Sequence, residues 1–300
     1  MFPLTPSVAA DTGVHLGDGS LYIRQNGTDT NYAYSVFGNA LEDQLYLLGH
    51  VIPTIESAYN IHKFGVHLAP EATWMSIVCQ SKDIALFKHK TLGLPNGRKV
   101  DPSIPLAIVD NAKLMKCCIR EILATDGVLG FYDASGKGLH KYGRIQIKMT
   151  ARRIIDQIAR FLLDEFGIEA SCRFNADAES GRRPRHILQI NRSQDIETWR
   201  SEIGFSNPSH ISRMMVFEEL GENPPGTSIL GRLSYLGGCS PTVKASIPLP
   251  KSAFESVISK MRNKFGSPDL DSDQIIERIE CINLRLQHLS RELPRLLRYG

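Results

Sequence analysis

Residues 9–20 read Ala9-Ala10-Asp11-Thr12-Gly13-Val14-His15-Leu16-Gly17-Asp18-Gly19-Ser20, and this stretch contains the feature on which the fold depends. Ala9, Gly13 and Gly17 recur every four residues, so in a helix they share one face that has almost no side chain. Glycine in an exposed helix interior costs about 1 kcal/mol relative to alanine, so two glycines at this spacing need a structural reason. The usual reason is a second helix whose backbone comes very close. Asp18 then lies at the end of that contact.

The limits of this helix and its partner can also be predicted. Thr5, followed by a proline, can cap the helix, and Gly19 can end it in a left-handed conformation. About a hundred residues later, residues 117–127 again run as a helix, then Asp-Gly, then apolar residues. If the two helices pack side by side, Asp18 and Asp126 meet at one end.

Two carboxylates brought together in this way repel each other unless cations lie between them. Such a pair is arranged like a divalent-metal site for phosphodiester hydrolysis, where metals hold the attacking and leaving oxygens. The alternative is that two unrelated helices each end in Asp-Gly, which is a common turn pair. The two dipeptides alone do not decide between these interpretations.

The same order of elements is predicted twice. In the first half we expect helices at 41–59 and 82–92 and strands at 20–25, 31–37, 63–68 and 73–79. In the second half we expect helices at 150–166 and 208–220 and strands at 129–132, 143–149, 170–174 and 186–191. Thr150 and Asp195 are the expected caps of two second-half helices, and Pro53 should kink or end a first-half helix. The repeated order indicates an internal duplication, and the mixed elements predict an α+β fold rather than a doubly wound sheet.

The two helices resemble the paired signature helices of LAGLIDADG homing endonucleases in their monomeric two-repeat form. Residues 80–84 followed by 92–99 are similar to the close of the first repeat in archaeal members. Residues 189–195 followed by 202–208 are similar to the close of the second repeat. The resemblance covers about residues 1–220. It implies two pseudo-symmetric αββαββα repeats that form a DNA-binding saddle.

We therefore expect a first repeat at 1–105, a second at 106–221, an irregular linker or arm at 222–250 and a helical hairpin extension at 251–300. The extension has a heptad seam of apolar residues, namely Ile275, Ile279, Ile282, Leu286, Leu289, Leu293 and Leu296. Such a seam packs helices against each other or the body of the protein, or it pairs two molecules. The core is expected to be monomeric, with self-association through this helix as the alternative.

The resemblance also implies a chemistry, which is site-specific binding of double-stranded DNA and Mg²⁺-dependent cleavage of its phosphodiester bonds. Another divalent cation such as Mn²⁺ could replace Mg²⁺. The implied metal ligands are Asp18, Asp126, Gly17 and Thr125, and the two aspartates are also implied to be catalytic. Family members place a basic residue near the metals, which the resemblance assigns to Arg98 or Lys99. The matching stretch of the second repeat, residues 207–210, has no lysine.

Alternation along the predicted strands gives one polar side to the second-half sheet. Its side chains are Arg, Lys, Gln and Asn, which read base edges in the major groove, and the absence of Asp and Glu favours DNA over a merely solvated surface. The expected contacts are Arg144, Gln146, Lys148, Arg173, Gln189 and Asn191, with Arg182, Arg183 and Arg185 on phosphates. The first half is less basic, and its expected contacts are Tyr22, Arg24, Lys63 and His67.

The second signature helix departs from the family at Glu121, where a small residue is usual. A glutamate buried at a helix crossing costs several kcal/mol unless it is paired. Either the helix register differs, or the helices are spread, or the carboxylate turns toward Arg120 or another cation at the edge. Ala124 also replaces an aspartate that is often present. The chain is thus either an endonuclease or a catalytically inactive descendant that acts as a DNA-binding regulator or an RNA splicing maturase.

Bulk composition excludes little. The net charge is only +3, with 35 Lys and Arg against 32 Asp and Glu, so a basic DNA-binding surface requires segregated charges. The six cysteines form no C-x-x-C pair, which argues against zinc and suits a reducing cytosol. No signal peptide or run of about 20 apolar residues is evident, so we expect a cytoplasmic, nucleoid-associated protein.

Overall fold

The computed structural model describes residues 2–26, 29–40, 42–69, 74–134, 136, 140–176, 184–223, 225–227, 229 and 232. The predicted hairpin extension at 251–300 and its heptad seam lie outside the described residues, as does most of the predicted arm at 222–250. No helix within the described ranges is long and apolar enough to cross a membrane.

The first half of the chain forms one antiparallel sheet with helices against it. Its strands are β1 (Gly19–Asn26), β2 (Asp29–Asn39), β3 (Gly65–Leu68) and β4 (Trp74–Cys79), in the order β1-β2-β4-β3. Its helices are α1 (Pro6–Leu16), α2 (Gln44–Tyr46), η1 (Leu47–Val51), α3 (Ile52–Tyr59), α4 (Lys82–Leu86) and η2 (Phe87–Thr91).

The second half repeats this plan. Its strands are β5 (Gly127–Tyr132), β6 (Tyr142–Met149), β7 (Ser171–Asn175) and β8 (Arg185–Ile190), in the order β5-β6-β8-β7. Its helices are α5 (Leu106–Val109), α6 (Ala112–Asp126), α7 (Arg152–Phe166), α8 (Ser193–Glu202) and α9 (Pro208–Leu220). The predicted α+β fold with two equivalent four-stranded sheets is confirmed. The domain boundaries drawn from the sequence remain predictions.

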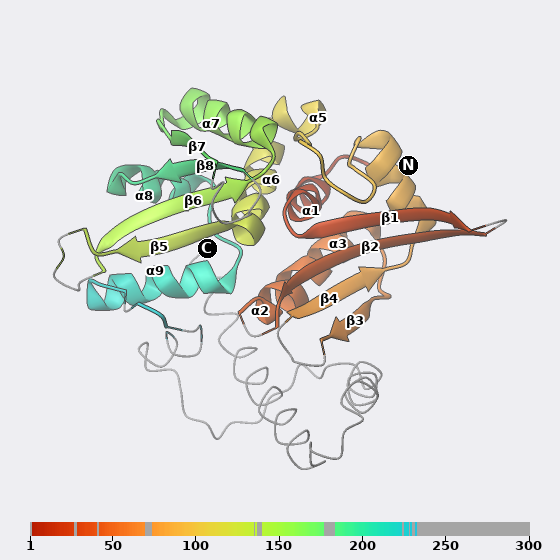
Figure 1. Ribbon diagram of the computed structural model, residues 1–300, viewed down its shortest axis with the longest axis horizontal. Coiled ribbons are helices and arrows are strands. Elements are labelled where there is room, and N and C mark those ends of the chain that lie inside the picture. The colour runs from red at the N-terminus through yellow and green to blue at the C-terminus, as the bar shows by residue number, and fades with distance from the viewer. Residues whose placement is uncertain are drawn as a thin grey trace, which may run out of the picture.

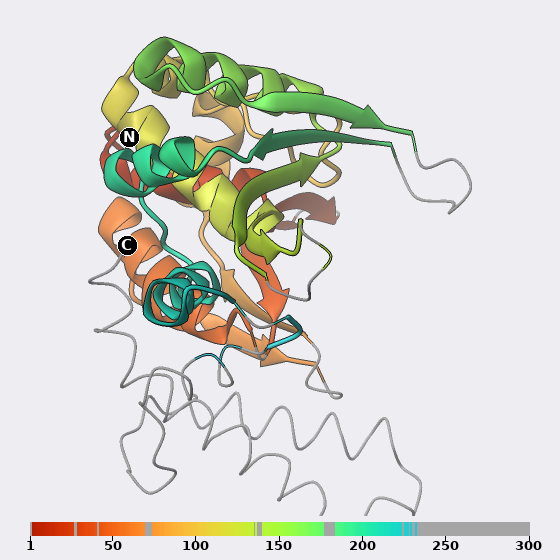
Figure 2. The same cartoon turned by 90° about the vertical axis from the view of Figure 1, so that its left-hand side faces the viewer.

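The two sheets lie side by side with α1 and α6 between them (Figure 1). Figure 2 shows the second sheet from its own side, with α7 beside it. The predicted stripe of small residues lies at the contact between α1 and α6. A Cβ atom on Gly13 would overlap the carbonyl group of Cys118, and one on Gly17 would overlap the Thr125 side chain. The two glycines are therefore required by the close approach of the second helix.

Each signature helix also contributes to the core of the other half. Ala9 and Leu16 of α1 belong to the apolar cluster that fills the second half, whereas Ala124 of α6 belongs to the cluster of the first half. The α1–α6 pair is thus part of both cores. A shift of one half of the molecule against the other would therefore disturb both apolar cores.

The predicted start of α1 is confirmed, but its predicted end is wrong. The Thr5 hydroxyl accepts a hydrogen bond from the Val8 N–H at 3.3 Å, as an N-cap does. The helix ends at Leu16, with Gly17 at the C-cap and a φ of −80°. Gly19 is instead the first residue of β1, paired with Val36.

Two other predicted caps are also wrong. Ala151, and not Thr150, takes the N-cap position of α7, which has no side-chain cap. Asp195 lies inside the first turn of α8, where it forms an ion pair with Arg192 at 3.5 Å. A carboxylate in a first turn is stabilised by the helix dipole without acting as the cap. Pro53 does not break its helix, since η1 and α3 follow each other directly and Pro53 lies in the first turn of α3.

Candidate functional site

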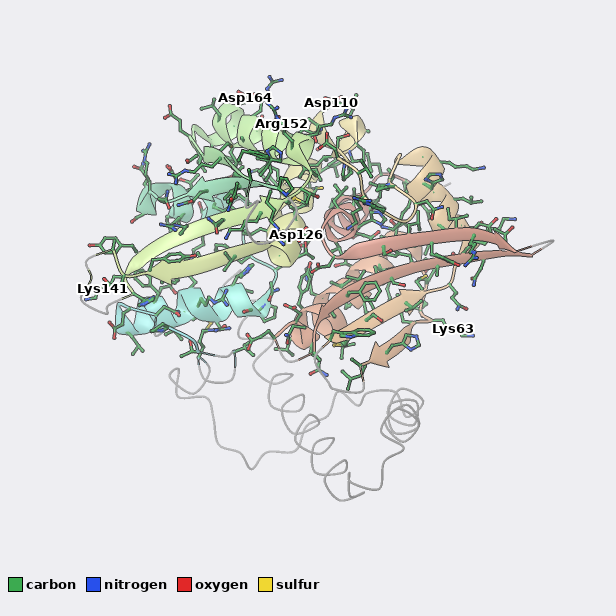
Figure 3. All side chains as sticks on the ribbon, in the orientation of Figure 1. Lys63, Asp110, Asp126, Lys141, Arg152 and Asp164 are labelled. Atoms are coloured by element: carbon green, nitrogen blue, oxygen red, sulfur yellow. The ribbon has the colours of Figure 1, made fainter. Side chains whose placement is uncertain are left out.

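Asp18 and Asp126 lie at neighbouring ends of the close-packed helix pair. Asp126 is the last residue of α6, and Figure 3 shows it at the junction of the two sheets. Asp18 follows α1 directly, and its carbonyl oxygen accepts a hydrogen bond from the Phe37 N–H at 3.2 Å. Burial and, after it, the charges of Asp126 and Asp43 raise the pKa of Asp18 to about 7, although Lys99 acts in the opposite direction. The two aspartates therefore share one electrostatic environment, while their role as metal ligands remains a prediction.

A cavity of about 390 Å³ adjoins this pair and is mainly basic. Its charged lining residues are Arg98, Lys99, Asp126, Lys148 and Arg185. The Lys99 ammonium donates to the carbonyl oxygens of Leu16, at 3.2 Å, and Gly17. Burial lowers the pKa of Lys99 to about 8, although Asp126 and Asp18 act in the opposite direction. Of the two predicted basic residues, Lys99 is the one held against the end of α1.

The loop before Lys99 is fixed to the first sheet by two residues. The Asn96 side chain accepts from the Ile23 N–H at 2.8 Å and donates to the Ile23 carbonyl at 3.1 Å, as a further strand would. Gly97 has a φ of 75° and donates its N–H to the Leu21 carbonyl at 2.8 Å. The Asn-Gly pair thus turns the chain so that Lys99 reaches the carbonyl oxygens at the end of α1.

A second cavity of about 470 Å³ lies against the start of β5, and its composition is different. It is lined by Glu42 and Asp43 from the first half and by Asn207, His210 and Arg213 from the second. The Asp43 carboxylate accepts from the Asn39 N–H at 2.8 Å and from the Asn207 side chain at 3.3 Å. This cavity combines acidic, amide, imidazole and guanidinium groups, whereas the first one is dominated by cations.

The cation absent from residues 207–210 is supplied one turn later by Arg213. Its guanidinium donates to the Leu129 carbonyl at 3.2 Å and lines the second cavity. His210 lines it too, and its buried Nδ1 has no hydrogen-bond partner within the described part of the chain. Burial lowers the pKa of His210 to about 3, helped by Arg213 and Arg232, so the ring is neutral at pH 7. Our sequence analysis missed both residues, although the predicted helix from Pro208 places them three apart on one face.

Glu121 has a full set of partners. Its carboxylate accepts from Tyr46 at 2.9 Å, His50 at 3.1 Å, Arg120 at 3.0 Å and Ser206 at 2.8 Å. The predicted contact with Arg120 is confirmed. The expectation that the carboxylate turns outward to the edge is wrong, because Glu121 is completely buried. Burial raises its pKa, but His50, Arg120 and Ser206 outweigh this effect and lower the pKa to about 2.

The outward side of the second sheet carries a connected polar surface, which we call the second sheet face. It contains Tyr132, Arg144, Gln146, Lys148, Arg173, Gln189 and Asn191. Gln146 and Gln189 are largely buried on this side, whereas Lys148, Arg173 and Asn191 are exposed. Gln146 donates to Gln189 at 3.3 Å, and Gln189 and Arg144 both donate to Asn191, at 2.7 and 2.9 Å. The Arg144 guanidinium also lies 4.3 Å from the centre of the Tyr132 ring. The structure therefore brings together six of the predicted contacts on one surface.

The other predicted contacts are more scattered. Arg185 begins β8 and lines the basic cavity, while Lys63 precedes β3. Tyr22, Arg24 and His67 lie on the outward side of the first sheet, since Tyr22 pairs with Ala33 and His67 with Ser76. Arg182 and Arg183 lie outside the described residues.

The donor set at the helix ends fits a hard divalent cation. Within the described ranges there is no group of three or more His, Cys, Asp or Glu residues that could hold a metal. The pair of aspartates, with the carbonyl oxygens of Gly17 and Thr125, offers oxygen ligands only. Mg²⁺ is usually bound by one or two carboxylates and completed by water and substrate phosphates, which matches this set.

Comparison with known proteins finds one family model and several solved structures that are similar to this chain. Residues 127–204 match the model of the LAGLIDADG-like domain. I-DmoI in complex with DNA and Mn has 15% sequence identity and a TM-score of 0.48, covering 67% of this chain and 98% of that chain. I-SmaMI bound to uncleavable DNA has 10% identity and a TM-score of 0.47, and the match covers 79% of this chain and 99% of I-SmaMI. I-WcaI bound to its DNA recognition sequence has 15% identity and a TM-score of 0.43, and the match covers 68% of this chain and 83% of I-WcaI. No curated protein matches the chain.

Proposed function

We propose that this protein binds double-stranded DNA across its two sheets and cleaves it by hydrolysis that depends on Mg²⁺ or Mn²⁺, as a two-repeat relative of LAGLIDADG homing endonucleases. The observation that carries the proposal is the electrostatic coupling of Asp18 and Asp126 at the ends of two helices in backbone contact. The LAGLIDADG-like match of residues 127–204 supports it.

Each group has a role in this proposal. Asp18 and Asp126 hold the cation, which when bound supplies positive charge to the attacking and leaving oxygens. The carboxyl group of Asp18 must lose a proton first, because its pKa is about 7. Lys99, held at the end of α1, is placed to stabilise the charge of a phosphate beside Asp126.

In the second half, we assign the role of Lys99 to Arg213. Arg213 lines the cavity that begins at Thr125 and Gly127, as Lys99 lines the one that begins at Gly17 and Gly19. The neutral His210 beside it can accept a hydrogen bond from a water molecule through Nδ1, which has no partner among the described residues. The two halves would thus act on the two DNA strands with different groups.

A second candidate is a DNA-binding regulator or RNA splicing maturase without cleavage activity. The observation that favours it is the bond of Lys99 to the Gly17 carbonyl, because this oxygen is one of the implied metal ligands. Glu121 no longer favours it, since its carboxylate is fully paired and the helices remain in contact at Gly13 and Gly17.

The experiment begins with selection of bound duplexes from a randomised DNA library at low salt. The selected duplex is then incubated with the protein and Mg²⁺, Mn²⁺ or EDTA, and the products are separated on a denaturing gel. We expect cleavage with either cation and none with EDTA. An Asp18→Asn variant should bind the same duplex without cutting it. Binding by the wild type with no cleavage under any condition would establish the second candidate instead.

A further inference from the structure

The outward side of the first sheet differs from the second sheet face in its chemistry. Cross-strand partners share one side of a sheet, and here the pairs are Tyr22 with Ala33, Ser35 with Val78, Phe37 with Ser76 and Asn39 with Trp74. We call this surface the first sheet face. Three aromatic residues are prominent on it, with 42% of Tyr22, 42% of Phe37 and 46% of Trp74 exposed. Single exposed apolar residues are ordinary, whereas contiguous ones can mark an interaction site, and the rings of Phe37 and Trp74 are adjacent.

The aromatic residues adjoin the proposed catalytic centre. Phe37 donates its backbone N–H to the carbonyl of Asp18, so its side chain leaves the sheet next to the paired aspartates. The ring of Trp74 lies 6.0 Å from that of Phe37, centre to centre. DNA that reaches Asp18 from the side of the sheet therefore passes over this pair.

The major groove offers one apolar group, which is the C5-methyl of thymine. The Phe37 ring has no hydrogen-bond donor or acceptor and the Trp74 ring has only its indole N–H, so this pair lacks the several donors and acceptors with which Gln, Asn and Arg side chains read base edges. The two rings can enclose a methyl group and remove its apolar surface from water. The planes of Phe37 and Trp74 are inclined by 55°, so the pair forms an angled wall and not a flat platform on which successive bases would stack.

We propose that Phe37 and Trp74 select thymine by contact with its methyl group in the part of the target bound by the first sheet, which we call the first half-site. This inference rests on the proposed function, since it requires duplex DNA on both sheets. The second half-site is read through hydrogen bonds by the accessible polar residues Arg144, Lys148 and Asn191. The target therefore has one half selected by apolar contacts and one half selected by donors and acceptors.

The test compares thymine with deoxyuridine in the selected duplex. Deoxyuridine keeps every donor and acceptor of thymine and lacks only the methyl group. Duplexes with this replacement in the first or the second half-site are titrated in gel shifts without divalent cations. We expect thymine to be enriched in the first half-site, and replacement there to weaken binding about fourfold for each methyl that is buried. Replacement in the second half-site should change affinity less than twofold.

The variants Phe37→Ser and Trp74→Ser assign the effect to the aromatic pair. Each should lose most of the discrimination between thymine and deoxyuridine in the first half-site, while binding of the deoxyuridine duplex stays close to that of the wild type. Leu163→Ser is the matched control, because Leu163 is an equally exposed apolar residue, at 50%, on α7. It should keep the full discrimination. Thermal melts of all variants show whether each one folds.

Several outcomes would overturn the inference. One is a wild type that binds its duplex without discriminating thymine from deoxyuridine in the first half-site. Another is a pair of folded serine variants that discriminate as the wild type does. A third is a serine variant that loses affinity for single-stranded RNA but not for the duplex, which would make the aromatic pair a stacking site. A wild type that binds no duplex at all contradicts the proposed function itself, which is a separate result.

Discussion

The first and second halves of the molecule have the same framework but different working surfaces. Each has a signature helix, a four-stranded sheet of the same strand order and a cavity at the helix end. The first sheet face carries Phe37 and Trp74, whereas the second carries a hydrogen-bonded series from Gln146 to Arg144. The shared framework is held by the cores and the helix contact, and the sheet faces are free to differ because their side chains do not contribute to either core.

The two cavities differ in the same way. The first one gathers Arg98, Lys99, Lys148 and Arg185 around Asp126, and the second one places Arg213 among Glu42 and Asp43. If each cavity acts on one strand of a duplex, as we propose, two unlike cavities predict unequal action on the two strands. The predictions below test this inequality and the contact that holds the halves together.

The largest effect is expected for Glu121, which joins the two halves. It accepts hydrogen bonds from Tyr46 and His50 of the first half and from Ser206 of the second. Glu121→Gly should destabilise the fold by about 3–5 kcal/mol, because it leaves Arg120 and two hydroxyl groups without their partner. Chemical denaturation measures this change. Glu202→Gln is the control, since its ion pair with Lys116 at 2.7 Å is exposed and should contribute less than about 1 kcal/mol.

The same residue has a defined pH dependence. The pKa of Glu121 is about 2 in the folded protein and about 4.3 in an unfolded chain. Its contribution is therefore complete above about pH 4.3 and is lost as the pH falls toward 2. The difference in unfolding free energy between the wild type and Glu121→Gly should shrink over that interval. A difference that is constant from pH 7 to pH 3 would contradict the paired carboxylate.

The second prediction separates the two cavities. Lys99→Met and Arg213→Met should each slow cleavage of one strand, by about 10²–10³-fold, and leave the other strand nearly unaffected. The expected product of each variant is nicked DNA, with opposite strands cut in the two cases. Strand-specific end labels on the selected duplex distinguish them. Arg200→Met is a control, because Arg200 pairs with Glu218 on the outside of the second half. Equal slowing of both strands by either variant would show that the cavities do not act separately.

How far the sequence predicts this site depends on the kind of interaction. The helix contact was predicted because Gly13 and Gly17 have no other reason to recur at that spacing. Strand alternation likewise predicted the second sheet face. The partners of Glu121 were not predicted, because Tyr46 and Ser206 lie 75 and 85 residues away in the chain and no local pattern links them. Arg213 was missed for a related reason, since only the packing of α9 brings it beside Asp43.

The third prediction compares the two aspartates. The pKa of Asp18 is about 7, above the value of about 3.9 in an unfolded chain, so its ionisation lowers stability between these pH values. Without divalent cations, Asp18→Asn should raise stability by about 3–4 kcal/mol at pH 8 and change it little at pH 4. Asp126→Asn should gain less, because Lys99 and Arg185 counteract the effect of burial on the Asp126 pKa. Thermal melts at both pH values measure the stability that each variant gains. An equal gain for the two variants would contradict the predicted difference between Asp18 and Asp126.

The smallest effect, a change in DNA affinity, is expected for single substitutions on the sheet faces. Each side chain there gives up a partner in the free protein when it contacts DNA. Arg144 already donates to Asn191 and lies over the Tyr132 ring, so DNA binding replaces bonds that exist in the free protein. Arg144→Ala should therefore weaken binding of the selected duplex by only about tenfold, near the lower limit for a residue that reads a base. Arg24→Ala on the outward side of the first sheet should weaken binding less and without change of sequence preference, because among the described residues the Arg24 guanidinium donates to Tyr22 alone, at 3.3 Å, and is exposed to solvent. Gel-shift titrations of matched and single-base-changed duplexes measure both affinity and preference. Loss of preference in the Arg24 variant but not in the Arg144 variant would reverse the assignment, with the first sheet reading donors and acceptors and the second only following the phosphates.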